Sequence, residues 1–488
     1  MDMMEESAGM QGSNPPAWRG YLAGLTVALM PLSFNIEKYI AGSKSPVYVS
    51  PFDFLLPVML LWLIIDLFGR KPWVAFRIPP VFSLIWAAVA IASILWTSSF
   101  PDKEILRAGA KAALNTLLFG LAGVWVFQNL SVKPGDYRKL LLVLGASFSI
   151  CVLLALKEYV GPVGVPYDPS DPTKNLGGVT NVRLGGWYDY RGVFGAEAAM
   201  MVPAAVAVAL LETDVVIRIA AIGVAIVSIC VTMAGGGFIA ECAGVLAVAG
   251  GYAVWSRKCL SVVAVVAGLI LLCLVVLPRL PRNNPSVIFR SVALYAEDTD
   301  KAVDNNSMPK PTARLRRYQA ALDLLASSDP WKQGSWPYWR KGVGSGQYQK
   351  NIDKFYQPPY QKPGKRGDEE AAYDMESDER FSWGFLETTA VELGLPGLIA
   401  VTLVFASWIA AGFGAFACAQ SGEQSEESRV CAMLALAALG AGVGALVSSI
   451  FLTPIIRGVG GSFAFFYALA LVSAMWARGR VHTGRSGL

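Results

Sequence analysis

The sequence predicts an all-α polytopic membrane protein with about twelve transmembrane helices. Hydrophobic residues make up 54% of the 488 residues and charged residues only 16%, which excludes an ordinary soluble enzyme. Apolar runs long enough to cross a bilayer as a helix, about 20 residues each, recur along the whole chain. Two long polar stretches interrupt them, residues 161–192 and 279–383.

The chain opens with residues 1–18, which we expect to form a disordered cytoplasmic tail. This segment carries acidic residues where a signal peptide has basic ones, and no short apolar core with a small-residue cleavage site follows. The first candidate span is the weakest, because it is short and stops at Glu37 and Lys38. The candidate spans lie near residues 20–36, 53–69, 79–98, 109–129, 139–159, 193–211, 214–233, 237–255, 259–277, 395–418, 429–451 and 459–477.

The distribution of basic residues predicts the orientation. If every run crosses the membrane, the Arg- and Lys-rich connections lie on one side, which the positive-inside rule assigns to the cytoplasm. Both termini are then cytoplasmic. These connections contain Arg70, Lys71, Arg77, Lys133, Arg138, Lys139, Arg257, Lys258, Arg478, Arg480 and Arg485. The expected organisation is nine helices and an outer loop (161–192) in residues 19–278, a large outer loop at 279–394, three helices at 395–478 and a tail at 479–488.

The large outer loop between the ninth and tenth spans is expected to be mainly helical. It contains too many aromatic residues for a solvated linker. The stretch "TARLRRYQAALDLLASSDP" has apolar residues at helical spacing and a proline stop, which predicts an amphipathic helix from Ala313 to Ala326. A loop of this length between tightly connected helices is typical of a functional element.

The first candidate functional motif is "NVRLGGWYDYRGVFGAEAAMM", in which Arg191 immediately precedes a span and Arg183 lies one loop earlier. A flanking arginine commonly extends to the lipid headgroups, and this interpretation stays open. The functional interpretation is a guanidinium group held at the bilayer surface to bind a phosphate in a bidentate way.

The second motif combines arginines with a glycine-rich loop. Arg314, Arg316 and Arg317 lie at the start of the expected loop helix, and "GVGSGQY" follows the proline stop. This loop lacks the Lys-Ser ending of a P-loop and no strand precedes it, so taken alone it predicts a turn.

The third motif is "RFSWGFLETTAVELGLPGL", which carries Arg380, Glu387 and Glu392 at the entrance to a span. A charge at bilayer depth costs roughly 2.5–3.5 kcal/mol on insertion scales. The glycines and the proline of "ELGLPGL" should break the helix, so that both carboxylates lie on a short helix at the outer interface. Such a helix lines a cavity or packs on protein.

In this order around a long outer loop, the three motifs resemble the O-antigen ligase and O-antigen polymerase superfamily. The matching stretches are "YRGVFGAEA", the arginine-led helix with its proline, "GVGSGQY", and "LExxxExGxPGL". Two departures stand out. Ser382 and Trp383 replace the ligases' His-Asn pair, and the only histidine, His482, lies in the expected cytoplasmic tail. In addition, "MAGGGF" replaces a Ser-Arg pair. Loss of that histidine makes polymerase chemistry the better interpretation.

The resemblance implies a C-type glycosyltransferase-like fold in a bacterial inner membrane and a substrate glycan on undecaprenyl pyrophosphate at the periplasmic face. Expected partners are this lipid-linked glycan, membrane lipids and a chain-length regulator. A nucleic-acid partner is not expected, because the formal charge is only +5. A cofactor is not expected either. No metal site is expected, because the cysteines form no CxxC pair and have no partner histidines.

Within this interpretation Arg191, with Arg314 or Arg317, stabilises the departing diphosphate. Glu387 accepts the proton of the attacking hydroxyl, although an ion pair or helix cap is the alternative role. Glu392 is expected to be structural, paired with a bundle arginine or with the loop. Further expected contacts to pyrophosphate or glycan are Arg183, Arg380, Trp187, Trp336 and Trp339, where each tryptophan either stacks on a sugar or belongs to the core of the loop.

Three other functions remain open at this stage. One is a ligase that moves a finished glycan onto lipid A core or protein, with Ser382 or Glu387 in the histidine's place. Another is a flippase or secondary transporter for a lipid-linked oligosaccharide, although no half-repeat is visible. The third is a non-catalytic protein that only binds the lipid-linked glycan.

Overall fold

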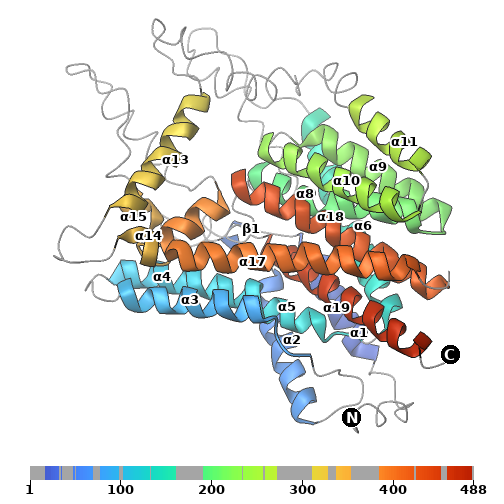
Figure 1. The fold of residues 1–488 in the computed structure, drawn as a ribbon, viewed down its shortest axis with the longest axis horizontal. Coiled ribbons are helices and arrows are strands. Elements are labelled where there is room, and N and C mark those ends of the chain that lie inside the picture. Colours follow the sequence, from blue (N-terminus) through green and yellow to red (C-terminus); the bar gives the residue numbers. More distant parts are fainter. Residues whose placement is uncertain are drawn as a thin grey trace, which may run out of the picture.

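The fold is a bundle of long helices with short helices gathered at one of its ends (Figure 1). The computed structural model describes residues 17–31, 34–35, 48–49, 51–69, 77–97, 103–131, 133–160, 191–232, 235–256, 259–271, 310–327, 337–352, 384–421, 425–451 and 459–485. Within these residues, eight helices are long and apolar enough to cross a membrane. The predicted all-α, multi-pass character is therefore confirmed.

The bundle helices coincide with the apolar runs. They are α1 (Ala17–Leu29), α2 (Pro51–Phe68), α3 (Val81–Thr97), α4 (Lys103–Asn115), α5 (Val124–Gln128), α6 (Pro134–Val160), α8 (Arg191–Leu211), α9 (Val215–Val231), α10 (Gly235–Ser256), α11 (Cys259–Leu271), α17 (Phe385–Ser421), α18 (Glu426–Phe451) and α19 (Gly460–Arg485). A π-helical segment, Thr116–Gly123, joins α4 to α5.

The described helices differ from the predicted elements mainly at their ends. Helix α1 begins at Ala17, inside the expected tail, and α19 continues to Arg485, so part of the second expected tail is helical. Helices α3 and α9 are shorter apolar helices than the eight long ones. Besides helices, the described part contains a small antiparallel pair of strands, β1 (Phe34–Asn35) and β2 (Tyr48–Val49). The count of twelve spans stays a prediction.

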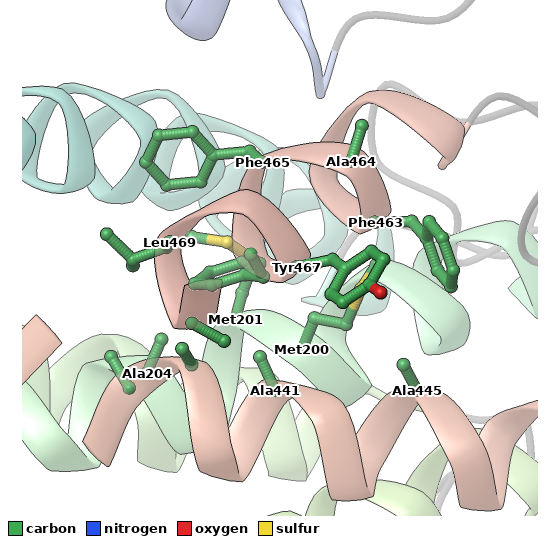
Figure 2. Close-up of a cluster of buried hydrophobic side chains, with 14 of the residues drawn as sticks. Met200, Met201, Ala204, Ala441, Ala445, Phe463, Ala464, Phe465, Tyr467 and Leu469 are labelled. Atoms are coloured by element: carbon green, nitrogen blue, oxygen red, sulfur yellow. The ribbon is translucent and has the colours of Figure 1, made fainter. Parts of the chain in front are cut away.

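Small residues allow the central helices α8, α10 and α18 to pack closely. A Cβ atom added to Gly444 would lie 1.8 Å from the carbonyl oxygen of Ala199, and one added to Gly237 would lie 2.7 Å from the Cα atom of Gly195. Membrane helices associate through such contacts because lipid supplies no hydrophobic force between them. Figure 2 shows larger side chains filling the space between α8, α18 and α19, among them Met200, Met201, Phe463 and Tyr467.

Successive helices run in alternating directions, so that their connections lie in turn at one end of the bundle and at the other. At one end, near the start of α17, the hydroxyl of Tyr318 donates to the carbonyl of Ile450 at the end of α18. At the other end, Arg138 at the start of α6 forms an ion pair with Glu212, which follows α8, at 2.8 Å. We call these the α17 end and the α6 end. This alternation is the arrangement that successive membrane crossings produce.

Buried carboxylates in the bundle have polar partners. Asp66 lies 2.9 Å from Arg19. Glu241 accepts a hydrogen bond from the Thr232 hydroxyl at 2.6 Å, and Glu197 accepts one from Ser462 at 2.5 Å. Because these partners come from other helices or from neighbouring loops, the hydrogen bonds of the carboxylates tie parts of the bundle together.

The Arg138–Glu212 ion pair makes the free energy of unfolding depend on pH in the acidic range. Glu212 lies just past α8, and the hydrogen-bonded guanidinium of Arg138 lowers the pKa of Glu212 from its ordinary 4.5 to about 2. Its contribution is complete above pH 4.5 and is lost as the pH falls from 4.5 towards 2. We expect Glu212→Gln to lower the free energy of unfolding near neutral pH by about 1.5–3 kcal/mol.

Thermal unfolding of detergent-solubilised wild type and Glu212→Gln, followed as a function of pH, checks this expectation. The difference in Tm should shrink as the pH falls through the window below 4.5. A constant difference at every pH would show that the ion pair is not its source.

Candidate functional site

The α17 end of the bundle contains a break in its longest helix. Gly394 in α17 has φ 66° and ψ −164°, outside the helical range, as the sequence predicted. The apolar stretch Phe385–Ala419 exceeds the roughly 20 residues that a bilayer needs, so we take the membrane-spanning part to begin after Gly394. The short preceding piece carries Glu387 and Glu392.

The glycine-rich loop Gly342–Gly346 lies directly against this break. The backbone N–H of Val343 donates to the carbonyl of Val391 and that of Gly344 to the carbonyl of Glu392, both at 2.9 Å. Gly342, Gly344 and Gly346 all have positive φ angles. The loop thus follows the helix more closely than side chains would permit, and it joins the second and third sequence motifs.

Tyr348, which ends this loop, contacts both carboxylates. Its hydroxyl donates a hydrogen bond to Glu387, and its backbone N–H donates one to the Glu392 carboxylate at 3.3 Å. Burial raises the pKa of Glu392 to about 7, while hydrogen bonds from the backbone of Gly346 and Tyr348 act in the opposite direction. Two carboxylates with different hydrogen-bond environments therefore lie on one short helix, a pattern typical of acid and base assignments.

Loop helices hold this arrangement in place (Figure 1). They are α13 (Lys310–Ala326), α14 (Tyr338–Lys341) and α15 (Tyr348–Ile352). A small core joins Ala320, Ala321 and Leu324 of α13 to Tyr348, Ile352 and Val391. The predicted amphipathic helix is confirmed, and it starts three residues before Ala313.

Helix α3 supports the loop from the bundle side. The Ser345 backbone N–H donates to the Ser93 hydroxyl oxygen at 3.2 Å, and the two hydroxyls lie 2.5 Å apart. Both side chains are buried. The loop is therefore fixed between α3 and α17, which gives its polar groups a defined position.

No family model and no curated protein matches this chain. Its function must be argued from the residues themselves.

The structure describes the predicted site residues to different extents. Arg183, Trp187, Trp336 and Arg380 lie outside the described residues. Arg191 is the first residue of α8, and Arg314 and Arg317 belong to the first half of α13; for these three the structure describes only the backbone position.

Trp339 lies at the surface of α14. It is 42% exposed, and the guanidinium of Arg340 lies 4.8 Å from the centre of its ring. Of the two roles expected for this tryptophan, membership of the loop core is wrong, and stacking on a sugar stays open. Within the described residues, no group of three His, Cys, Asp or Glu side chains is arranged to hold a metal ion.

Sequence reasoning missed Tyr348 and Ser345 as members of the site. Ser345 lies between the last two glycines of "GVGSGQY" and Tyr348 ends this stretch, where the turn brings them next to α3 and α17. Polar residues within and directly after a glycine-rich turn were the available signal, but the partner helices are far away in sequence. Only the folded chain brings Ser93 and Glu387 to the same loop.

Proposed function

We propose that this protein is an inner-membrane polysaccharide polymerase. It transfers a glycan from undecaprenyl pyrophosphate to a sugar hydroxyl of a lipid-linked repeat unit on the periplasmic face. One observation carries the proposal: Glu387, Glu392 and Tyr348 meet at the bundle end where α17 begins its membrane crossing. The resemblance of the three ordered motifs to the O-antigen ligase and O-antigen polymerase superfamily supports a reaction of this class, and the absence of the ligases' histidine favours the polymerase.

The reaction needs a proton acceptor and a stabilised leaving group. The acceptor hydroxyl oxygen forms a bond to the anomeric carbon of the donor, and the bond from that carbon to the diphosphate oxygen breaks. Glu387 takes the hydroxyl proton, and its hydrogen bond from Tyr348 orients the carboxylate. Glu392 anchors the glycine loop and so keeps Tyr348 in position.

The leaving undecaprenyl diphosphate develops negative charge at the membrane surface. Arg191 begins α8, and a guanidinium there binds phosphate oxygens as the charge develops. Arg314 and Arg317 of α13, together with Arg183 and Arg380, supply further cations on the same side of the proposed topology. Trp339, exposed on α14, offers a ring face to a sugar.

The proposed topology has twelve crossings, cytoplasmic termini and periplasmic loops at 161–192 and 279–394. The alternation of helix ends between the α17 end and the α6 end supports it. The α17 end is then periplasmic, and the α6 end, with Lys133, Arg138 and Lys139, is cytoplasmic.

Reconstitution with a synthetic lipid-linked repeat unit tests the function. We expect wild-type protein to produce a ladder of chain lengths, and Arg191→Ala to reduce product by about 10²–10³-fold through loss of charge stabilisation. Arg429→Ala is the matched control, because Arg429 is exposed in the first turns of α18 at the opposite end. A single transfer onto lipid A core without a ladder would instead identify a ligase, and full activity of Arg191→Ala would remove the assignment of this arginine.

A further inference from the structure

A cavity lies at the α6 end, the opposite end from the proposed active site, and the proposed reaction does not use it. Its volume is about 430 Å³, within the range of small-molecule sites. The start of α1, the end of α2, the residues that follow α5 and the start of α6 surround it. Four helix ends therefore meet around one opening at the level where a membrane surface is expected.

Charged groups of both signs lie in and beside this cavity. Arg19 lines it and is held by Asp66 at 2.9 Å. Asp136 accepts a hydrogen bond from Ser131 at 2.5 Å, and Lys139 lies one helical turn later on the same face of α6. Within the described part of the chain, the ion pairs are Arg19–Asp66 and Arg138–Glu212, so Lys139 belongs to neither.

Most of the remaining wall is apolar or aromatic. The rings of Trp18 and Trp62 lie 4.8 Å apart, and both side chains are partly exposed at the rim. Leu22, Met59 and Leu63 continue the apolar wall further inside the bundle. Tryptophans at a rim of this kind are typical of the membrane interface, where the ring lies between headgroups and acyl chains.

We propose that this cavity binds one zwitterionic aminophospholipid from the adjacent leaflet. The lipid phosphate lies between Arg19 and Lys139, the ammonium group faces Asp136, and an acyl chain follows the wall formed by Leu22, Met59 and Leu63. An amphipathic ligand matches a cavity with charges at its mouth and an apolar interior.

The charge balance selects the headgroup. Arg19 and Lys139 of the lining are matched by Asp136, which also lines the cavity, and by Asp66, which holds Arg19 from outside the lining, so these four groups carry no net formal charge. An anionic headgroup gains little overall attraction from a neutral site, whereas a zwitterion places each of its charges opposite a partner. The apolar wall favours a lipid over the free headgroup, because burial of an acyl chain contributes to affinity.

Glycines of α1 supply a matched pair of variants. Gly20 lines the cavity, and a Cβ atom added there meets no atom within 4 Å, so Gly20→Leu adds a bulky side chain at the cavity wall without a backbone clash. Gly24, one turn later, has equally open surroundings but does not line the cavity. Gly24→Leu therefore controls for the helix change, and Lys139→Gln removes a charge while leaving the packing unchanged.

Native mass spectrometry of the delipidated full-length protein in detergent measures binding of phosphatidylethanolamine, phosphatidylglycerol and soluble phosphoethanolamine. We expect one phosphatidylethanolamine per chain, at least about fivefold weaker phosphatidylglycerol binding, and about tenfold weaker phosphatidylethanolamine binding in Gly20→Leu and Lys139→Gln. Gly24→Leu should bind as the wild type does.

Three results would overturn the proposal. Equal or tighter binding of phosphatidylglycerol would contradict the zwitterionic headgroup. Full displacement of the lipid by millimolar phosphoethanolamine would identify a soluble ligand instead. Unchanged phosphatidylethanolamine binding in Gly20→Leu would place the lipid elsewhere on the protein.

Discussion

Glu387→Gln is expected to abolish polymer formation while leaving the protein folded and inserted. The amide keeps the size of the side chain and can still accept a hydrogen bond from Tyr348, but it cannot take a proton from the acceptor sugar. Removal of a general base typically lowers a rate by about 10²–10⁴-fold. In the reconstituted assay the ladder should disappear, and lipid-linked substrate should remain.

Tyr348→Phe separates orientation from proton transfer. The phenyl ring still packs against Val391 and Leu324 in the loop core, whereas the hydroxyl that orients Glu387 is lost. We expect a loss of about tenfold with a changed pH profile of the rate, which a purely packing role would leave unaltered. Glu426→Gln, exposed at the opposite end of the bundle, should have no effect on the ladder.

Glu392 provides the decisive comparison with Glu387. If Glu392 anchors the loop, Glu392→Gln keeps part of the activity, because an amide oxygen still accepts the hydrogen bond from the backbone of Tyr348. A fully active Glu387→Gln together with an inactive Glu392→Gln would reverse the two roles. Such a result is physically reasonable, since burial already raises the pKa of Glu392 to about 7.

The helices were predictable from the sequence because lipid imposes a strong rule. A backbone in hydrocarbon must satisfy its own hydrogen bonds, so each long apolar run becomes a helix. The break at Gly394 was predictable as well, since Gly394, Pro396 and Gly397 follow one another at the entrance to a span. The amphipathic helix α13 followed from its apolar spacing and its proline stop.

The meeting of distant motifs was not predictable from local pattern. Taken alone, "GVGSGQY" indicated a turn, and nothing within it pointed to α3 or α17. The contact depends on two glycine backbones that approach each other, Gly342 and Gly394, and on the buried pair Ser93 and Ser345. Such contacts arise from tertiary packing, which the chemistry of short segments does not encode.

Gly394→Ala is expected to inactivate the protein by separating the glycine loop from α17. Its φ of 66° and ψ of −164° lie in a region that essentially only glycine adopts. An added Cβ atom would lie 2.7 Å from the backbone nitrogen of Gly342 and 2.9 Å from that of Lys341, and neither atom can move without displacing the loop. The combined strain and overlap cost about 2–4 kcal/mol.

This cost falls on the contact between the glycine loop and α17 rather than on the bundle. Activity should therefore be lost while membrane insertion is retained. When the loop moves away, the hydroxyl of Tyr348 no longer reaches Glu387, and this proposed proton acceptor loses its orientation. Gly414→Ala in the same helix is the matched control, because its surroundings are open and alanine favours a helix by about 0.5–1 kcal/mol. Thermal unfolding and the ladder assay together test this prediction. A Gly394→Ala protein with wild-type activity would show that the contact between loop and helix does not position the proposed catalytic carboxylate.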